Sequence, residues 1–177
     1  MRATESPVIR HRCSELFFIF RSVRTGNAAV CRRIYYRMSD VELLARLIQC
    51  EAGGEGETGM RAVATVIVNR LRIPYGEYGE YGSLRDVVTA PYQFECYLNA
   101  ARGNPQNIYN MNPGAIHYQI AQEALSGQRL ALVAEALWFF NPYSDVCPPN
   151  FPSGVGAWPV RIGRHCFYVP TEYYYNT

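Results

Sequence analysis

Residues 49–57, with the sequence Gln-Cys-Glu-Ala-Gly-Gly-Glu-Gly-Glu, place three carboxylates at the end of one helical pattern and in the glycine-rich turn that follows it. Glu51 lies seven, four and three residues after Leu44, Leu47 and Ile48, so it falls on the apolar face of the helix that these residues predict. We therefore expect the Glu51 side chain to point towards the core or the wall of a cleft.

A carboxyl group in that position is held in its protonated form by two effects that act in the same direction. Partial burial disfavours the anion, and so does the negative end of the helix dipole. Cleavage of a glycosidic bond requires an acid that keeps its proton near neutral pH, because the leaving oxygen is protonated as the bond breaks. Glu51 is therefore the predicted catalytic acid. The alternative is a structural glutamate paired with Arg46 or Arg70.

Two helices are expected to hold this segment. Ser39, followed three residues later by Glu42, is typical of a capping box that opens the first helix, and the glycine pair at 53 and 54 stops it. Thr58 is the predicted N-cap of the second helix, which runs to about residue 72 and is closed by Pro74.

Shorter elements follow along the rest of the chain. We predict a surface loop at 75–82, a short helix from Ser83 to Pro91, an irregular aromatic segment at 92–97, a helix from Asn112 to Gly127, and strands at 137–140, 157–162 and 165–169. Helices first and strands later predict a single α+β domain, mostly helical, with a small C-terminal β-sheet. No linker divides residues 38–177.

Charge separates residues 1–37 from this domain. The first 37 residues hold eight arginines and two acidic residues, whereas residues 38–177 hold nine arginines and thirteen acidic residues. Such a basic tail suits a nucleic-acid arm, a transit peptide or a membrane-surface segment. Its apolar run, Leu16–Phe20, is too short for a signal-peptide core or a membrane span. We expect a dispensable basic extension, no nucleic-acid partner and a working domain that begins near Met38.

The cysteines and histidines do not form a recognisable metal or redox motif. The six cysteines include no C-x-x-C pair, and the two histidines after Met38 are not part of H-E-x-x-H, so we expect no metal site. Isolated cysteines are more often small buried apolar residues than ligands. Whether Cys147 and Cys166 form a disulfide stays open, and a thiol peptidase would need Cys50 or Cys96 beside a histidine.

Several separate stretches of residues 39–177 resemble the cell-wall hydrolase family of bacterial spores typified by SleB and CwlJ. These stretches are Leu44-Ala45-Arg46-Leu47, Glu51-Ala52 with Gly54-Glu55-Gly56, Gly59-Met60, Val68-Asn69-Arg70, Gln93-Phe94, 137–142 and His165-Cys166-Phe167-Tyr168. The closing H-C-F-Y is similar to the CwlJ branch. The resemblance implies a lysozyme-related, lytic-transglycosylase-like fold and cleavage of spore-cortex peptidoglycan during germination.

The resemblance also implies roles for particular residues. Glu51 is implied as the catalytic acid, and a lone acid is sufficient for lytic transglycosylation, in which the muramyl 6-hydroxyl attacks instead of water. Hydrolysis would need a second carboxylate, for which Glu55, Glu57 and Glu95 are the nearby candidates. Of these, Glu55 belongs to the motif, and we expect it to orient the turn through backbone N–H groups.

Gln93, Phe94 and Asn141 are the other expected substrate contacts, as two amides and a stacking ring. Each has a structural alternative: Phe94 suits a core anchor, and Asn141 belongs to an Asn-Pro turn. His165 in an apolar strand suits a hydrogen-bonded structural role more than a catalytic one.

Further expectations come from the family alone. They are peptidoglycan as substrate, a spore-coat anchoring protein as partner, no resident cofactor, calcium dipicolinate as activating signal, and a position at the boundary of coat and cortex after synthesis in the mother cell without a signal peptide. Two rival functions remain. One is an amidase or peptidase that acts on peptidoglycan, and the other is a non-catalytic coat protein that only binds it.

Overall fold

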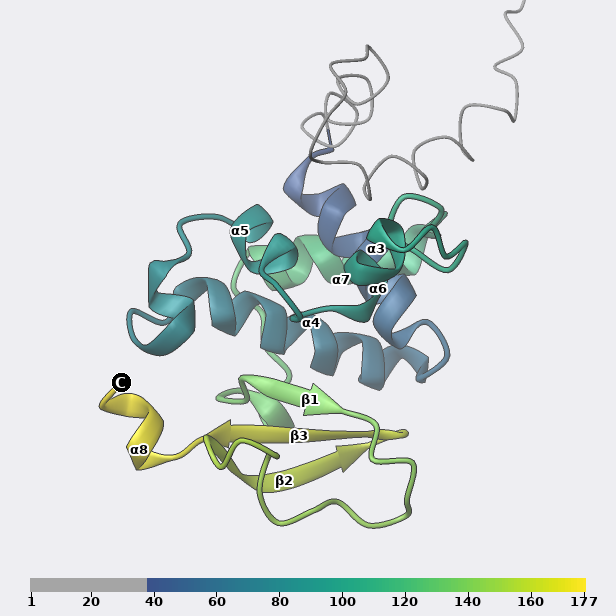
Figure 1. Cartoon of the computed structure of the whole chain (residues 1–177). Helices are drawn as coiled ribbons and strands as arrows, with labels where there is room; N and C mark the ends of the chain where they lie inside the picture. The colour runs from purple at the N-terminus through teal and green to yellow at the C-terminus, as the bar shows by residue number, and fades with distance from the viewer. Residues whose placement is uncertain (1–37) are drawn as a thin grey trace, which may run out of the picture.

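Residues 38–177 are described by the structure, a computed structural model, and the predicted basic extension lies outside them. The helices are α3 (Asp40–Ala52), α4 (Gly56–Arg72), α5 (Leu84–Thr89), α6 (Glu95–Ala101), α7 (Ala115–Leu125) and α8 (Glu172–Tyr175), with 3-10 turns η2 (Gly76–Glu80) and η3 (Ala131–Val133). The strands are β1 (Trp138–Phe140), β2 (Gly156–Ile162) and β3 (His165–Pro170). Most helices lie on one side of α4 and the sheet lies on the other (Figure 1).

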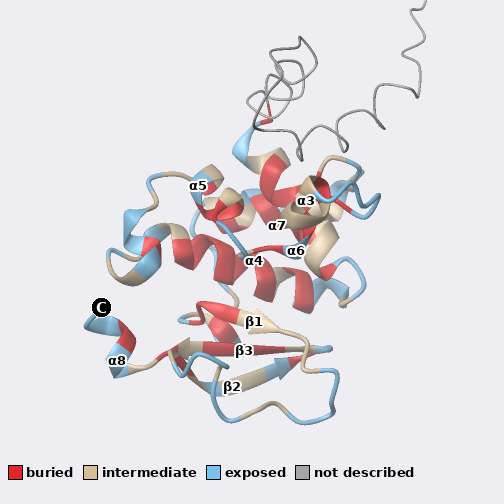
Figure 2. Ribbon diagram, viewed as in Figure 1, coloured by how far each residue is buried: buried red, intermediate tan, exposed pale blue. Residues whose placement is uncertain are grey.

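The helix α4 lies at the centre of the fold. Its buried residues point in every direction around the helix axis, from Gly59 to Arg70, which is the pattern of a core helix and not of a surface one. Figure 2 shows this as a nearly continuous buried ribbon between the other helices and the sheet. The chain on either side of the glycine-rich turn is therefore anchored, because α3 also buries most of one face.

The sheet is antiparallel, with strand order β1-β3-β2, and its two faces join two apolar clusters. Phe167 of β3 packs in the main core with α3, α4 and α7. Its neighbours Cys166 and Tyr168 point to the opposite face, into a second cluster with Trp138 and Tyr174. The predicted α+β class, with a mostly helical domain and a small C-terminal sheet, is confirmed.

Several predicted boundaries are correct. The Ser39 hydroxyl accepts the Glu42 N–H at 3.2 Å, so the N-cap of α3 is confirmed. The ends of α3, α4 and α5 and all three strands also lie within a residue or two of the predicted positions.

Other predicted elements are wrong for local reasons. Thr58 is not the cap of α4, because the helix begins at Gly56 with Glu55 as its N-cap residue, three residues earlier than predicted. The expected surface loop at 75–82 contains a 3-10 turn whose Tyr78 is buried, and the expected irregular segment at 92–97 contains the start of α6. The helix α7 begins after Gly114, whose N–H donates to His117 Nδ1 at 3.1 Å, and not at Asn112.

The four cysteines after Met38 form two disulfides. Cys50 of α3 is bonded to Cys96 of α6, and Cys147 is bonded to Cys166 of β3. The sequence does not decide the bond between Cys147 and Cys166, whereas the bond between Cys50 and Cys96 contradicts the prediction that Cys50 is a packing residue.

No helix in residues 38–177 is long and apolar enough to cross a membrane.

We predict that Asn69→Ala lowers the free energy of unfolding by about 2–3 kcal/mol, because one buried and one partly buried carbonyl group lose their donor. Asn69 is buried, and its Nδ2 donates to the carbonyl oxygens of Ala134 at 2.8 Å and Ala136 at 2.9 Å. Urea unfolding monitored by circular dichroism measures this cost. Asn110→Ala is the control, since its Nδ2 donates to Pro105 at the surface. Equal stability losses in the two variants would contradict the prediction.

Candidate active site

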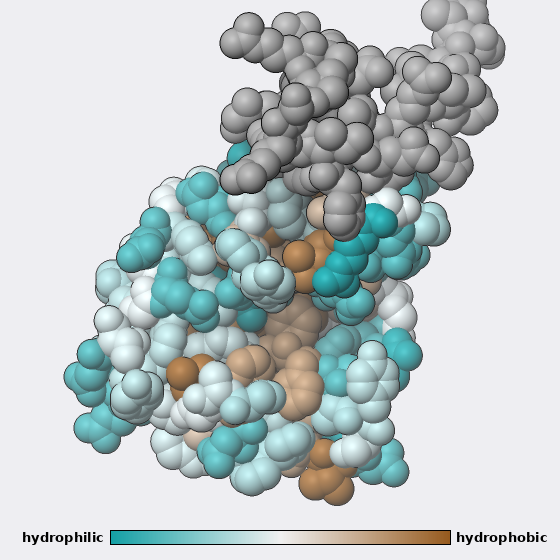
Figure 3. Space-filling view, viewed as in Figure 1, coloured by the Kyte–Doolittle hydropathy of each residue, from teal (hydrophilic) through white to brown (hydrophobic). Residues whose placement is uncertain are grey.

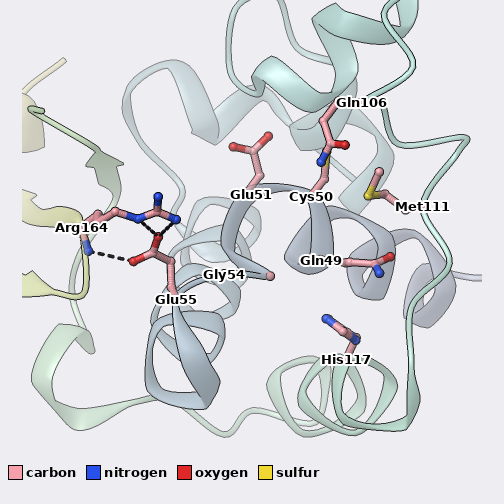
Figure 4. A pocket seen from close by; sticks show the side chains of 10 residues that line it. Gln49, Cys50, Glu51, Gly54, Glu55, Gln106, Met111, His117 and Arg164 are labelled. Atoms are coloured by element: carbon pink, nitrogen blue, oxygen red, sulfur yellow. Dashed lines mark hydrogen bonds and ion pairs between the residues drawn. The ribbon is translucent and has the colours of Figure 1, made fainter.

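An open pocket of about 530 Å³ lies beside Glu51. It is formed by the end of α3, the glycine-rich turn, the 102–114 loop, the start of α7 and the turn between β2 and β3. Its lining residues are Gln49, Cys50, Glu51, Gly53, Gly54, Glu55, Gln106, Met111, His117 and Arg164. Figure 4 shows Glu51 between the Glu55–Arg164 pair on one side and Cys50, Gln106 and Met111 on the other. On the face shown in Figure 3, the surface is hollowed between the helical part and the sheet.

Glu51 lies in the last turn of α3 and accepts a hydrogen bond from another helix. Its Oε1 accepts the backbone N–H of Cys96 at 3.0 Å. Cys96 stands in the first turn of α6, whose N-cap residue Phe94 gives no side-chain cap, so this N–H has no partner within its own helix. The bond therefore satisfies a helix donor and orients the carboxyl group at the same time.

Burial raises the pKa of the Glu51 carboxyl from its ordinary value of 4.5 to about 7. The hydrogen bond from Cys96 opposes this rise, the negative charge of Glu95 adds to it, and the positive charge of Arg70 opposes it. A large fraction of Glu51 is therefore protonated near neutral pH. Since Oε1 is the acceptor for Cys96, Oε2 is left to carry the proton.

The two arginines proposed as salt-bridge partners of Glu51 are committed elsewhere. Arg46 pairs with Glu42 at 2.9 Å and donates to backbone carbonyls of the 102–114 loop. Arg70 donates from Nε to the Leu137 carbonyl at 2.7 Å. Within residues 38–177 no ion pair to Glu51 is formed at 4 Å or less, so the structural-glutamate alternative is not supported.

Glu55 clamps the β2–β3 turn against the glycine-rich turn. Its carboxylate is almost fully buried and accepts both the backbone N–H and the Nε–H of Arg164 at 2.7 Å. Burial by itself would raise the pKa of Glu55, but the Arg164 hydrogen bonds lower it below its ordinary value. Glu55 does bind a backbone N–H as expected, although that group belongs to the distant turn at Gly163–Arg164. A Cβ at Gly163 would collide with the Glu55 carboxylate, so this contact requires glycine there.

Gln93 and Phe94 surround Arg70 and are not part of the pocket lining. Gln93 Oε1 accepts from Arg70 Nη1 and from the Tyr78 hydroxyl, each at 3.1 Å. Phe94 is 2% exposed, and its ring centroid lies 5.2 Å from the Arg70 guanidinium carbon. A ring buried to this degree has no face for a sugar, so Phe94 is a core anchor and its predicted stacking role is wrong.

Asn141 and His165 also lie outside the pocket lining. Asn141 Oδ1 accepts the Tyr143 N–H at 2.9 Å, which is the turn geometry that the Asn-Pro alternative described. The His165 ring packs edge-on against Phe139 with ring centroids 5.5 Å apart. Burial lowers the pKa of His165, which keeps the ring neutral near pH 7.

Four polar side chains that line the pocket were not predicted as substrate contacts: Gln49, Gln106, His117 and Arg164. Gln49 donates from Nε2 to the Asn112 carbonyl at 3.1 Å, while its Oε1 is buried without a partner. Gln49 stands two residues before Glu51, and Arg164 stands in the predicted turn between two strands, so both were within reach of sequence reasoning. Gln106 belongs to a loop without a motif, so no sequence pattern predicts that it lines the pocket.

The rival thiol chemistry is not supported by the geometry. Cys50 and Cys96 are bonded to each other, so neither is a free thiolate beside a histidine. In the part of the chain that the structure describes, no three His, Cys, Asp or Glu side chains converge as metal ligands.

Comparison with known proteins gives a consistent picture. Residues 54–168 match the family described as Cell Wall Hydrolase. The chain is 31% identical over 143 residues to the cell wall hydrolase CwlJ of Bacillus subtilis, covering 78% of this chain and 94% of that protein. It is 30% identical over 134 residues to the spore cortex-lytic enzyme of the same species, covering 73% of this chain and 37% of that protein.

The fold is also that of solved catalytic domains. The SleB catalytic domain of Bacillus cereus matches with a TM-score of 0.54 at 24% identity, covering 73% of this chain and 88% of that one. The SleB catalytic domain of Bacillus anthracis, named a germination-specific lytic transglycosylase, matches with a TM-score of 0.52 at 25% identity, covering 73% and 93%. The predicted lytic-transglycosylase-like fold is therefore confirmed.

We predict that Glu51→Gln removes a pH-dependent loss of stability. Because the pKa of Glu51 is about 7 in the folded chain and about 4.5 in the unfolded chain, the folded state binds more protons between these values. The free energy of unfolding of the wild type therefore falls as pH rises through this window, with the loss complete above pH 7. From pH 5 to pH 8 this amounts to about 2–3 kcal/mol relative to the variant.

Urea unfolding of both proteins at pH 5 and pH 8 tests this expectation. Glu57→Gln is the matched control, because Glu57 is exposed and pairs with Arg61 within the same helix, α4. If wild type and Glu51→Gln changed in parallel with pH, the carboxyl group would have its ordinary pKa.

Proposed function

The chain belongs to the cell wall hydrolase family, and from that premise we propose that it cleaves the glycan strands of peptidoglycan with Glu51 as the general acid. The observation that carries the proposal is the position of Glu51 on the pocket wall with a pKa raised to about 7. A general acid works best when its pKa is close to the working pH, since it is then both protonated and able to release its proton.

The proposed step begins with proton transfer from Glu51 Oε2 to the glycosidic oxygen. The bond from that oxygen to the sugar C1 breaks, and the leaving sugar departs with the proton. The Glu51 anion that remains is stabilised by the N–H of Cys96 at 3.0 Å and by the positive charge of Arg70. The muramyl 6-hydroxyl then attacks C1 and returns its proton to Glu51, which gives a 1,6-anhydro end and restores the acid.

The surroundings of the other carboxylates favour this single-acid chemistry over hydrolysis. Both oxygens of Glu55 are occupied by Arg164, and Glu57 pairs with Arg61 at 2.9 Å. Glu95 is exposed on α6, outside the residues that line the pocket. Two-carboxylate hydrolysis needs a second group that is free to activate water or attack C1. The relative from Bacillus anthracis is named a lytic transglycosylase, and we extend that reaction to this chain.

Substrate contacts are proposed from the pocket lining. Gln49 and Gln106 offer amide groups to N-acetyl and hydroxyl groups of the glycan, and the buried Oε1 of Gln49 still lacks a donor. His117 and Arg164 complete the polar lining of the pocket. In this arrangement Gln93 acts indirectly, because it holds Arg70 near Glu51.

The biological substrate is proposed from the names of the relatives. One relative is named a spore cortex-lytic enzyme, and a solved neighbour is named germination-specific. We propose spore-cortex peptidoglycan as the substrate of this chain, cut during germination.

We expect wild-type protein to release muropeptides with anhydromuramic ends from purified cortex peptidoglycan, and Glu51→Gln to lose at least about 100-fold in rate. The substitution keeps the shape and the acceptor for Cys96 but removes the acid proton. Mass spectrometry of the soluble products identifies the ends. Glu57→Gln is the active control, and Glu55→Gln is expected to lose less activity than Glu51→Gln.

Each other result would contradict a defined part of the proposal. Reducing ends in place of anhydro ends would indicate a hydrolase. Equal rates for wild type and Glu51→Gln would remove Glu51 as the acid. Binding of the glycan by wild type without new ends would favour a non-catalytic binding protein, and release of peptides without glycan cleavage would favour the amidase or peptidase alternative.

A further inference from the structure

The hydrogen bond that orients Glu51 joins two helices that are distant in the sequence. Its acceptor is in the last turn of α3, and its donor is Cys96 in the first turn of α6. The disulfide between Cys50 and Cys96 spans 46 residues and connects the same two turns. One of its cysteines therefore precedes the acceptor residue directly, and the other is the donor residue.

The contact lies at the start of α6, a short helix. The helix has seven residues, and its N-cap Phe94 contributes no side-chain cap. Its hydrogen bonds to the following loop include the Ile108 N–H to the Cys96 carbonyl at 3.4 Å, the Asn104 N–H to the Asn99 carbonyl at 2.9 Å and Asn99 Nδ2 to the Gln106 carbonyl at 3.0 Å. A hydrogen bond weakens steeply once the donor and acceptor separate by more than a few tenths of an ångström. The disulfide holds the Cα atoms of its two cysteines 6.0 Å apart, which limits that separation.

We propose that the Cys50–Cys96 disulfide is a positioning element for the catalytic acid, because it keeps the Cys96 N–H on Glu51 Oε1 and leaves Oε2 as the proton donor. This inference rests on the proposed function of Glu51. Neither cysteine takes part in the reaction. Both act indirectly, by fixing the position of the Glu51 carboxyl group.

Loss of the disulfide has a definite consequence for the acid. The Cys96 N–H lowers the pKa of Glu51 against the effect of burial, so its withdrawal raises that pKa further. The other charged groups near Glu51 are Glu95 on α6 and Arg70 on α4, and His117, Glu55 and Arg164 line the same pocket. None of these is bonded to the disulfide. The basic limb of the pH–rate profile then moves to higher pH while the maximal rate falls, since the proton is no longer confined to Oε2.

The same bond makes the site sensitive to reduction by a dithiol. Dithiothreitol breaks the sulfur–sulfur bond, two thiols form on the protein, and the reagent is oxidised to its cyclic disulfide. Cys50 lines the pocket, so this bond adjoins the surface through which small reagents enter.

The test compares two variants that each lose one disulfide. Cys50→Ala/Cys96→Ala removes the bond beside Glu51, and Cys147→Ala/Cys166→Ala removes the bond that ties the loop before β2 to β3. Both variants keep every backbone N–H group. We expect the first to lose about tenfold or more in kcat with a basic limb moved up by about half a unit to one unit. The second keeps the wild-type pH profile, even though both lose thermal stability.

An unmoved basic limb in the first variant, or one moved to lower pH, would overturn the proposal. If that variant does not fold, Cys147→Ala/Cys166→Ala protein folded under oxidising conditions is assayed before and after dithiothreitol and again after reoxidation. The proposal then requires the same upward movement on reduction and its reversal on reoxidation. The activity of Glu51→Gln distinguishes a failure of this proposal from a failure of the proposed function. If Glu51→Gln is active, the proposed function is wrong. If Glu51→Gln is inactive and the basic limb of Cys50→Ala/Cys96→Ala does not move, only the positioning role of the disulfide is wrong.

Discussion

Burial of one carboxyl group at the end of a helix is the constraint on which the rest of this site depends. Burial raises the pKa of Glu51 to about 7, and the same burial destabilises the folded chain at neutral pH. Rotation of the Glu51 side chain into solvent would remove this loss of stability. Contacts within the fold must therefore hold the carboxyl group in its buried position. The backbone N–H of Cys96 and the disulfide beside it resist that movement, while Arg70 supplies a positive charge for the anion that forms during turnover.

Polar contacts join the sheet to both ends of α4. Arg70 on the central helix α4 reaches the Leu137 carbonyl at the start of β1, and its guanidinium carbon lies within 6 Å of the ring centroids of Tyr78, Phe94 and Phe139. Glu55, just before the same helix, binds the turn between β2 and β3 through Arg164. Because one link lies at each end of α4, the sheet is fixed relative to Glu51. Figure 4 shows the link between Glu55 and Arg164 among the residues that line the pocket.

The part of the fold that could be predicted from sequence is the part governed by local chemistry. The apolar spacing of α3, its Ser39 cap and the position of Glu51 on the buried face all follow from neighbours within one or two turns. The errors arise where contacts between residues that are distant in the sequence determine the local structure. Phe94 is a cap residue of α6 buried under Arg70, and Cys50 is bonded to a residue 46 positions away. Gln106 reaches the pocket only through the folded path of the 102–114 loop, which no local pattern encodes.

A direct titration of the Glu51 carboxyl group tests whether its pKa lies near 7, as a buried general acid requires. Protein labelled with ¹³C at the glutamate side-chain carboxyl is titrated by NMR, and the Glu51 signal is assigned as the one that disappears in Glu51→Gln. A midpoint close to pH 7 is the result that the structure predicts. A midpoint at about 4.5, the ordinary value for a solvated glutamate, would contradict the assignment of Glu51 as a buried general acid.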